Sequence, residues 1–342
     1  MPTTHTARRF GGGEQPTDEE EAVKDNRTPK TDDATNAGVR TEADHHTPDD
    51  VAGQSPKRSS RRDFVLAASA GVGALLLGRR AESLVPRSTS AVVAPQPIGI
   101  QLYTVRDLMQ KNFEHTLQQI AAIGYKEVEF AGLFEKEPKW VRTKVLDKVG
   151  LTSPSSHIPY ERLKSNLAGV AEEARILGNR YVVCPWMDMK AHPDSAAWRR
   201  IAADFNRFGE SLQRVGLQFG YHNHDFEFKP LADGGKAFDI LLADCDPKLV
   251  KIELDLYWIT TAGGDPLAYF AKFPGRFPLV HVKDRTGAGE MVNVGQGSID
   301  WNKIFAKRRE AGIQHFFVEH DNPKSPLEDI KASYTYMSRL GL

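Results

Sequence analysis

The sequence predicts a (β/α)8 barrel, also called a TIM barrel, preceded by a disordered leader and an export-signal segment. Short β-forming runs alternate with helix-forming runs over residues 97–340, a pattern typical of a parallel sheet surrounded by helices. Successive strands in the second half end in His, Asp or Glu, as expected where barrel strands carry an active site. The alternative, an open doubly wound sheet, lacks the G-x-G-x-x-G sequence after its first strand.

The N-terminal region divides into a leader and a signal segment, followed by a barrel domain at residues 96–342. Residues 1–59 are polar and contain almost no large apolar side chains. Such a segment cannot bury enough surface to offset the entropy cost of ordering, so we expect it to be disordered. Two origins stay open for so long a leader: a misassigned start codon, or a genuine extension ahead of the signal.

Residues 60–95 resemble a twin-arginine (Tat) export signal. Arg61 and Arg62 precede an apolar run at 64–77, and small residues at 88–94 offer a cleavage region. The run of about 14 residues is too short to span a membrane comfortably but suits a signal sequence. We therefore expect export by the Tat machinery to a periplasmic or other extracytoplasmic location. An uncleaved segment would instead anchor the protein to the membrane, and a chance basic–apolar junction is the remaining alternative.

Eight strands are predicted from short runs rich in β-branched and aromatic residues. A predicted helix follows each strand, with apolar residues at helical spacing such as Phe113, Leu117 and Ile120, and Gly124 as the C-cap. The predicted strands are 98–103, 127–130, 151–157, 180–184, 217–221, 250–255, 277–282 and 316–319. The predicted helices are 113–123, 138–149, 163–177, 196–215, 237–243, 266–272, 301–311 and 326–340.

Charge and cysteine content narrow the function. The chain has 45 basic and 45 acidic residues, and this balance argues against a nucleic-acid partner, which normally requires a basic surface. Cys184 and Cys245 are the only cysteines, so neither a disulfide framework nor a cysteine-rich metal site is expected. Any metal ion must therefore be held by histidines and carboxylates.

Polar residues end four consecutive predicted strands. His222, Asp255, His281 and Glu319 follow strands five to eight, and barrel strands deliver their C-terminal residues to one face. A set of two imidazoles and two carboxylates suits Mn²⁺, Zn²⁺, Co²⁺ or Fe²⁺ and fits Mg²⁺ less well. We expect these four residues to bind a divalent metal, with Mn²⁺ as the first choice. The alternative is that each residue is a separately satisfied polar strand end.

Several motifs resemble the xylose isomerase-like, sugar phosphate isomerase/epimerase superfamily. They are Ile-Gly-Ile-Gln-Leu-Tyr at 98–103, Leu-Asp at 254–255, His-Val-Lys-Asp at 281–284, Gly-Gln-Gly-Ser-Ile-Asp-Trp at 295–301 and Val-Glu-His-Asp at 318–321. The resemblance covers residues 97–340 and does not specify a substrate. Superfamily members include ketose 3-epimerases, inosose dehydratases, dehydroshikimate dehydratases and apurinic endonucleases.

The resemblance implies a metal site with one departure. In the epimerase branch, Glu, Asp, His and Glu on strands five to eight hold the metal, and Asp255, His281 and Glu319 match the last three positions. At the strand-five position this chain reads His222-Asn223-His224. Since the two glutamates of the epimerases form the acid/base pair, symmetric two-base epimerisation is in doubt. Imidazole remains a competent ligand or base near neutral pH.

The implied function is a metal-dependent isomerase or epimerase that acts on a small keto-sugar or related polyol through an enediolate. One alternative is an exported lyase or hydratase that acts on 3-keto-sugars or 3-keto-glycosides, and a second is a non-catalytic sugar-binding barrel. An apurinic endonuclease is disfavoured because those sites use more metal ligands and a basic surface. The oligomeric state stays open, with a homo-oligomer as one option.

Other side chains near the predicted strand ends are candidates for catalysis or substrate binding. Glu319 and His224 are the candidate bases, and Lys283 would neutralise an enediolate. Asp225 and Glu227 are candidates for orienting the histidines. The predicted substrate-binding residues are His157, Glu129, Trp186, Trp258 and Arg285.

Overall fold

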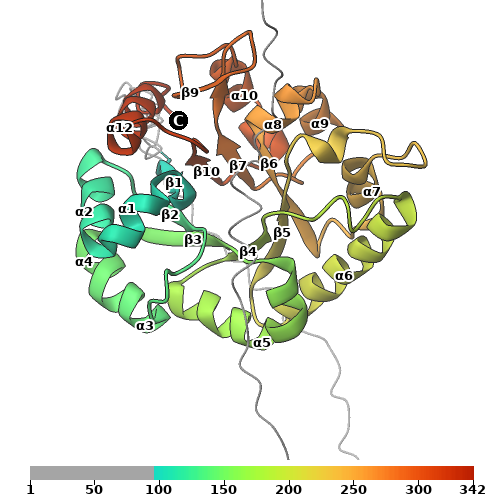
Figure 1. The fold of residues 1–342 in the computed structure, drawn as a ribbon, viewed down its shortest axis with the longest axis horizontal. Coiled ribbons are helices and arrows are strands. Elements are labelled where there is room, and N and C mark those ends of the chain that lie inside the picture. Colours follow the sequence, from blue (N-terminus) through green and yellow to red (C-terminus); the bar gives the residue numbers. More distant parts are fainter. Residues whose placement is uncertain (1–95) are drawn as a thin grey trace, which may run out of the picture. The chain divides into compact units, whose positions relative to one another are not determined.

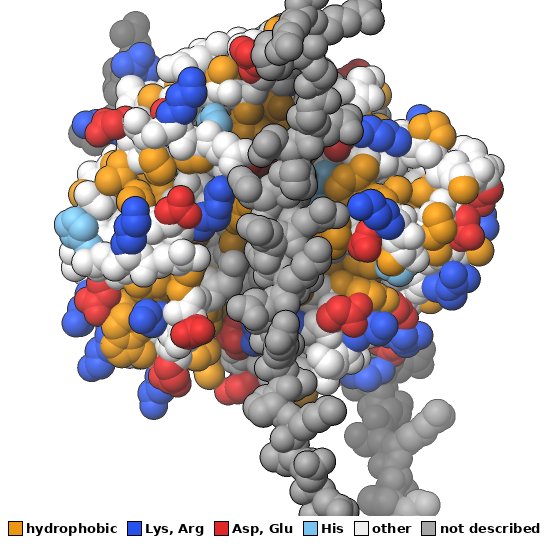
Figure 2. Space-filling model, viewed as in Figure 1, with side chains coloured by type: hydrophobic (Ala, Val, Ile, Leu, Met, Phe, Trp, Pro, Cys, Tyr) orange, Lys and Arg blue, Asp and Glu red, His pale blue; other side chains and the backbone are white. Residues whose placement is uncertain are grey.

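The computed structural model of the protein describes residues 96–342. The predicted leader (1–59) and the predicted signal segment (60–95) lie outside the described residues, so both stay predictions. Among the described residues, no helix is long and apolar enough to cross a membrane. Figure 2 shows basic and acidic side chains interspersed over the visible face, in agreement with the net charge of zero.

Eight parallel strands close into a barrel in the order β1-β10-β7-β6-β5-β4-β3-β2, and helices surround them (Figure 1). This architecture confirms the predicted (β/α)8 fold. The observed strands are shorter than several of the predicted runs, because their first and last residues lie in the connecting loops. The strands are β1 (Gly99–Gln101), β2 (Glu127–Phe130), β3 (Thr152–His157), β4 (Tyr181–Cys184), β5 (Gln218–His222), β6 (Val250–Asp255), β7 (Leu279–Val282) and β10 (His315–Val318).

The helical layer differs from the prediction in four places. The predicted helix 138–149 is divided by a π-helical turn at Val141–Leu146, and the predicted helix 301–311 breaks at Lys307. Helices α1 and α8 were not predicted because each lies within one loop after a strand and is only six residues long. The helices are α1 (Arg106–Lys111), α2 (Phe113–Ile123), α3 (Pro138–Trp140), α4 (Asp147–Val149), α5 (Tyr160–Leu177), α6 (Ser195–Gln213), α7 (Ala237–Asp244), α8 (Leu256–Thr261), α9 (Pro266–Lys272), α10 (Trp301–Ala306), α11 (Arg308–Ala311) and α12 (Pro326–Met337).

Helix α6 shows how the outer layer positions a strand. Its buried residues include Trp198, Ile201 and Phe205, which recur at the three- and four-residue spacing of one helical face. The Phe205 ring lies 5.1 Å from Phe219 and 5.3 Å from Tyr221, both on β5. This aromatic contact fixes the outer face of the strand that ends at His222.

The interior of the barrel has its own small apolar layer. Tyr181, Val183, Leu279 and Phe317 form a buried cluster separate from the main core between strands and helices. The Phe317 ring lies 6.2 Å from His281. A polar layer therefore rests directly on an apolar one inside the barrel.

The loop after β7 is organised around the buried carboxylate of Asp284. This residue starts a short ribbon, β8 (Asp284–Arg285) with β9 (Met291–Val292), and accepts hydrogen bonds from the backbone N–H groups of Gly295 and Gly297 at 2.9 and 3.1 Å. The Trp301 indole N–H donates to it at 3.0 Å. The Gly-Gln-Gly-Ser-Ile-Asp-Trp motif thus wraps its backbone around one carboxylate, which explains its glycines structurally.

We predict that Gly297→Ala destabilises the fold by about 1–3 kcal/mol, the usual cost of overpacking. A Cβ at this position would overlap the Asp284 carboxylate and the Arg285 carbonyl. Urea denaturation would measure the change. Gly287→Ala is the matched control, since a Cβ there meets no atom within 4 Å. Equal stability of the two variants would contradict this account of the loop.

Candidate metal site

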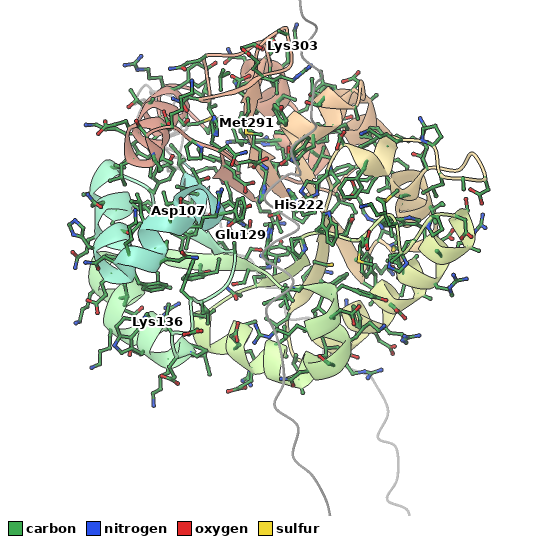
Figure 3. All side chains as sticks on the ribbon, in the orientation of Figure 1. Asp107, Glu129, Lys136, His222, Met291 and Lys303 are labelled. Carbon is green, nitrogen blue, oxygen red and sulfur yellow. The ribbon has the colours of Figure 1, made fainter. Side chains whose placement is uncertain are left out.

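Four strands deliver the predicted metal ligands to one place inside the barrel. His222 ends β5, Asp255 ends β6, His281 lies on β7, and Glu319 follows β10 directly. In the parallel register Asp255 pairs with His281. All four side chains are buried, and their ligand atoms lie within 4.8 Å of one another. Figure 3 shows His222 near the centre of the ring of strands.

The His222 ring is held so that one nitrogen faces Asp255. Its Nδ1 lies 3.1 Å from the Pro185 carbonyl, which only accepts hydrogen bonds, so Nδ1 carries a proton. In a neutral imidazole the other nitrogen, Nε2, then has a lone pair, and it lies 3.3 Å from Asp255 Oδ2. Two acceptors at this distance require a positive charge between them, either an imidazolium proton or a metal ion.

His281 and Glu319 give a second observation of the same kind. The Nδ1 atom of His281 lies 2.7 Å from Glu319 Oε2, yet both atoms are buried and neither makes a hydrogen bond of acceptable geometry. Burial lowers the pKa of His281, but the charges of Glu253 and Glu319 raise it well above its ordinary value. The surroundings therefore favour positive charge at this position.

Lys283 lies among the site's carboxylates. Its Nζ is 3.2 Å from Asp255 Oδ2, 2.9 Å from Glu319 Oε2 and 2.7 Å from Asp321 Oδ1. Burial lowers the pKa of Lys283, but these three carboxylates raise it well above its ordinary value, so the side chain is an ammonium ion. It supplies a fixed positive charge beside the ligands.

A second group of buried side chains lies beside the first and shares His281. His157 Nε2 is 2.7 Å from Glu253 and 3.3 Å from Glu129, while His281 Nε2 is 2.7 Å from Glu129 and 3.3 Å from Glu253. Gln101 Nε2 also donates to Glu129, at 2.8 Å. Two clusters of potential ligands therefore meet at one imidazole.

His224 lies beside the site, and its backbone is held by the carboxylate of Glu227. Its backbone N–H donates to Glu227 at 2.8 Å, and Tyr221 donates to the other oxygen of Glu227 at 2.6 Å. Burial, followed by the charges of His222 and Lys283, lowers the pKa of His224 well below its ordinary value. The ring is thus neutral, and its buried Nδ1 makes no hydrogen bond.

The remaining predicted residues, Trp186, Trp258 and Arg285, lie on different elements and differ in exposure. Trp186 follows Pro185, whose carbonyl contacts His222, and its side chain is 41% exposed. Trp258 lies on α8, where its ring is 5.7 Å from His224 and its buried Nε1 makes no hydrogen bond. Arg285 lies in the β8–β9 ribbon.

Two predicted side chains make contacts that the sequence did not indicate. Glu129 is fully buried and contacts Gln101 and His281, and its predicted contact with a sugar stays a prediction. Asp225 pairs with Lys229 at 2.7 Å and does not orient a histidine ring.

Three functional-site residues were not singled out from the sequence. Glu253 lies two residues before Asp255 on β6, and the two-residue repeat of a strand places both side chains on the barrel interior. This repeat could have identified Glu253 from the sequence. Gln101 lies within a recognised motif, and Asn223 accepts the backbone N–H of Asp255 at 3.1 Å.

The four predicted ligands fit a divalent metal ion. Each offers one donor atom, two nitrogens and two oxygens, and such atoms lie about 2.0–2.2 Å from Zn²⁺, which in a tetrahedral site places them about 3.3–3.6 Å from one another. The observed spacings of 2.7, 3.3 and 3.8 Å lie on both sides of this range. A metal ion would then be a common partner for His281 Nδ1 and Glu319 Oε2, neither of which makes a hydrogen bond.

Comparisons with known proteins agree with the fold. The model of the xylose isomerase-like TIM barrel family matches residues 117–340. An inosose dehydratase of Lacticaseibacillus casei is 25% identical over 247 residues, covering 60% of this chain and 80% of that protein. A sugar phosphate isomerase/epimerase structure from Parabacteroides distasonis is 27% identical, with a TM-score of 0.63, and covers 74% of this chain and 98% of its own.

A more distant structure supports the fold alone. The IolI protein, described with a bound zinc atom, is 16% identical with a TM-score of 0.56 and covers 72% of this chain and 98% of its own. The relatives indicate that the protein is an enzyme, which leaves the non-catalytic sugar-binding alternative without support.

We predict that Glu319→Gln weakens binding of a divalent metal by more than the roughly 10–100-fold typical of residues that only support a ligand. The change removes a carboxylate charge and a donor oxygen while keeping the side-chain shape. Chelator competition with Co²⁺ would measure the affinity. Asp225→Asn is the control because Asp225 pairs outside the site, and equal affinities for both variants would rule out Glu319 as a ligand.

Proposed function

The chain belongs to the xylose isomerase-like TIM barrel family, and on that basis we propose that it dehydrates a keto-polyol or keto-sugar with the help of a divalent metal. The observation that supports this proposal is the pair of imidazoles at the end of β5, His222 and His224, in the place of a glutamate. The chain has an imidazole ligand, His222, and a neutral imidazole, His224, where a two-base epimerase would use a glutamate. The similarity to inosose dehydratases supports the same reaction class, since inososes are cyclic keto-polyols.

A divalent cation held by His222, Asp255, His281 and Glu319 would supply Lewis-acid stabilisation of the negative charge that develops on a carbonyl oxygen. We propose Mn²⁺ first, with Zn²⁺, Co²⁺, Fe²⁺ and Mg²⁺ as alternatives, because mixed nitrogen and oxygen donors accept all of them to different degrees.

His224 is the proposed acid/base residue. The C–H bond next to the substrate carbonyl breaks, and its proton passes to the imidazole. The C–O bond one carbon further along then breaks, and the same imidazolium returns the proton to the departing hydroxyl, which leaves as water. The Lys283 ammonium lies close enough to the ligands to stabilise the anion between these steps.

Two tryptophans are the proposed substrate contacts. The unpaired Nε1–H of Trp258 is a donor without an acceptor, and a substrate hydroxyl or carbonyl oxygen would satisfy it. The half-exposed Trp186 offers an apolar ring face for the C–H face of a sugar.

Isomerisation or epimerisation is the second candidate. The similarity to a sugar phosphate isomerase/epimerase favours it, and both reactions begin with removal of the same proton. They differ in the next step: reprotonation of carbon gives an isomer, whereas loss of the neighbouring hydroxyl gives an unsaturated ketone or its diketone tautomer.

We predict that the metal-loaded protein, incubated with an inosose in D₂O, releases one molecule of water per turnover. Mass spectrometry and the ultraviolet absorbance of the product would follow the reaction. His224→Asn should lower kcat by roughly 10²–10⁴-fold, the usual contribution of a general acid or base. Asp225→Asn is the control.

A recovered isomer of unchanged composition that carries solvent deuterium would replace dehydration by isomerisation. Full activity of His224→Asn would remove His224 from the mechanism whichever product forms.

We also propose that the protein is exported by the twin-arginine pathway, on the grounds of its Arg61-Arg62 sequence and the apolar run at 64–77. Arg61→Lys combined with Arg62→Lys should leave the full chain in the cytoplasm of a host with a functional Tat system. Cell fractionation would measure this. Export of the double variant at the level of the unaltered chain would contradict the proposal.

A further inference from the structure

We infer that Glu129 is a positioning residue that directs the lone pair of His281 toward the metal. This inference rests on the metal site proposed above but does not depend on the reaction. It also gives a role to Gln101, whose motif the catalytic proposal leaves unexplained.

The contacts of Glu129 form a short chain across the barrel. Its Oε2 atom accepts hydrogen bonds from His281 Nε2 at 2.7 Å and from Gln101 Nε2 at 2.8 Å. Gln101 is oriented in turn, because its Oε1 accepts the backbone N–H of Tyr103 at 3.1 Å. Residues of β1, β2 and β7 are thereby linked inside the barrel, and Figure 3 shows Glu129 near its centre.

A neutral imidazole has one lone pair and one N–H. A carboxylate oxygen only accepts, so the contact with Glu129 places the proton of His281 on Nε2. The lone pair then lies on Nδ1, the atom that faces Glu319 without a hydrogen bond. A carboxylate that holds the far nitrogen of a metal-bound histidine fixes both its orientation and its basicity.

The same reasoning decides between the two clusters that share His281. If the group of Glu129, His157, Glu253 and His281 also held a metal ion, His281 would have to give up its last ring proton to serve both groups. Glu129 Oε2 already has two donors, and His157 lies 2.7 Å from Glu253. We therefore assign the metal to the His222 group and assign support of His281 to the Glu129 group.

A second glutamate–histidine pair on the same strand provides a matched control. Glu127, two residues before Glu129 on β2, lies 2.8 Å from His315 Nδ1. This pair joins the first residues of β2 and β10, the strand ends opposite to those that carry the ligands. Replacement of Glu127 therefore removes a similar buried contact without touching the metal site.

The test measures metal binding in the absence of substrate, so it stays informative if the proposed reaction is wrong. For the full chain loaded with Co²⁺, we expect one equivalent of metal. We expect about 10-fold weaker binding for Glu129→Gln, whose amide oxygen still accepts the N–H, and about 100-fold weaker binding for Glu129→Ala. Glu127→Gln should bind as the unaltered protein does.

Proton NMR of the Co²⁺-loaded protein supplies a readout that a general loss of stability would not reproduce. The His281 Nε2–H should give a metal-shifted signal that persists in D₂O, because it is buried and hydrogen-bonded to Glu129. The signal should exchange away in Glu129→Ala while metal is still bound at saturating Co²⁺. If the alanine variant does not fold, the glutamine variant provides the affinity comparison.

Two results would overturn the inference. Unchanged Co²⁺ affinity in Glu129→Gln and Glu129→Ala would make Glu129 a merely structural residue. Binding of two equivalents, one of them lost in Glu129→Ala, would show that the Glu129 group is itself a second metal site.

Discussion

The centre of this barrel holds more negative than positive charge, and the rest of the site depends on that constraint. Glu129, Glu253, Asp255 and Glu319 are buried together, and the Lys283 ammonium contacts two of them, Asp255 and Glu319. An unpaired buried carboxylate costs several kcal/mol, so such a group persists only when protons, ammonium ions or metal ions neutralise it. Three imidazoles, His157, His222 and His281, lie between these carboxylates. Each imidazole carries a proton or faces an acceptor where a metal ion could bind, and one divalent cation would reduce the remaining excess of negative charge.

The geometry that makes this charge cluster tolerable comes from apolar packing on both sides of the sheet. Outside, the aromatic contacts between α6 and β5 fix the strand that carries His222. Inside, the layer containing Val183, Leu279 and Phe317 fills the barrel below the polar groups. Because neither layer can move without opening a cavity, the ligands keep their positions although their charges repel. The apolar layers therefore stabilise the fold, whereas the repelling charges of the polar layer destabilise it.

The sequence indicated the candidate ligands but not the side chains that contact them. His222, Asp255 and Glu319 were singled out because a strand followed by a polar residue is a local pattern. Glu129 was predicted to contact a sugar, but its contacts with Gln101 and His281 were not predicted. Its partner His281 is 152 residues away, so the contact exists only once the barrel has closed. Local periodicity carries no information about such a contact. The break at Lys307 was missed for the opposite reason, because an apolar pattern continues across it.

The end of β5 and the loop that follows it bear on the choice between elimination and epimerisation. Removal of a proton beside a carbonyl needs a cation, a nearby ammonium group and one base, and the strand ends supply the first two for either outcome. Epimerisation further needs an acid on the opposite face of the substrate, which is the task of the strand-five glutamate in the epimerases that this chain resembles. Here His222 occupies that position, with its Nδ1 proton donated to the Pro185 carbonyl and its Nε2 directed at Asp255. It is thus engaged on both nitrogens and has no proton to deliver to carbon. In the proposed mechanism His224 would act as a base on one side of the substrate. Acid available on that side alone would favour loss of the hydroxyl over return of a proton to the far face.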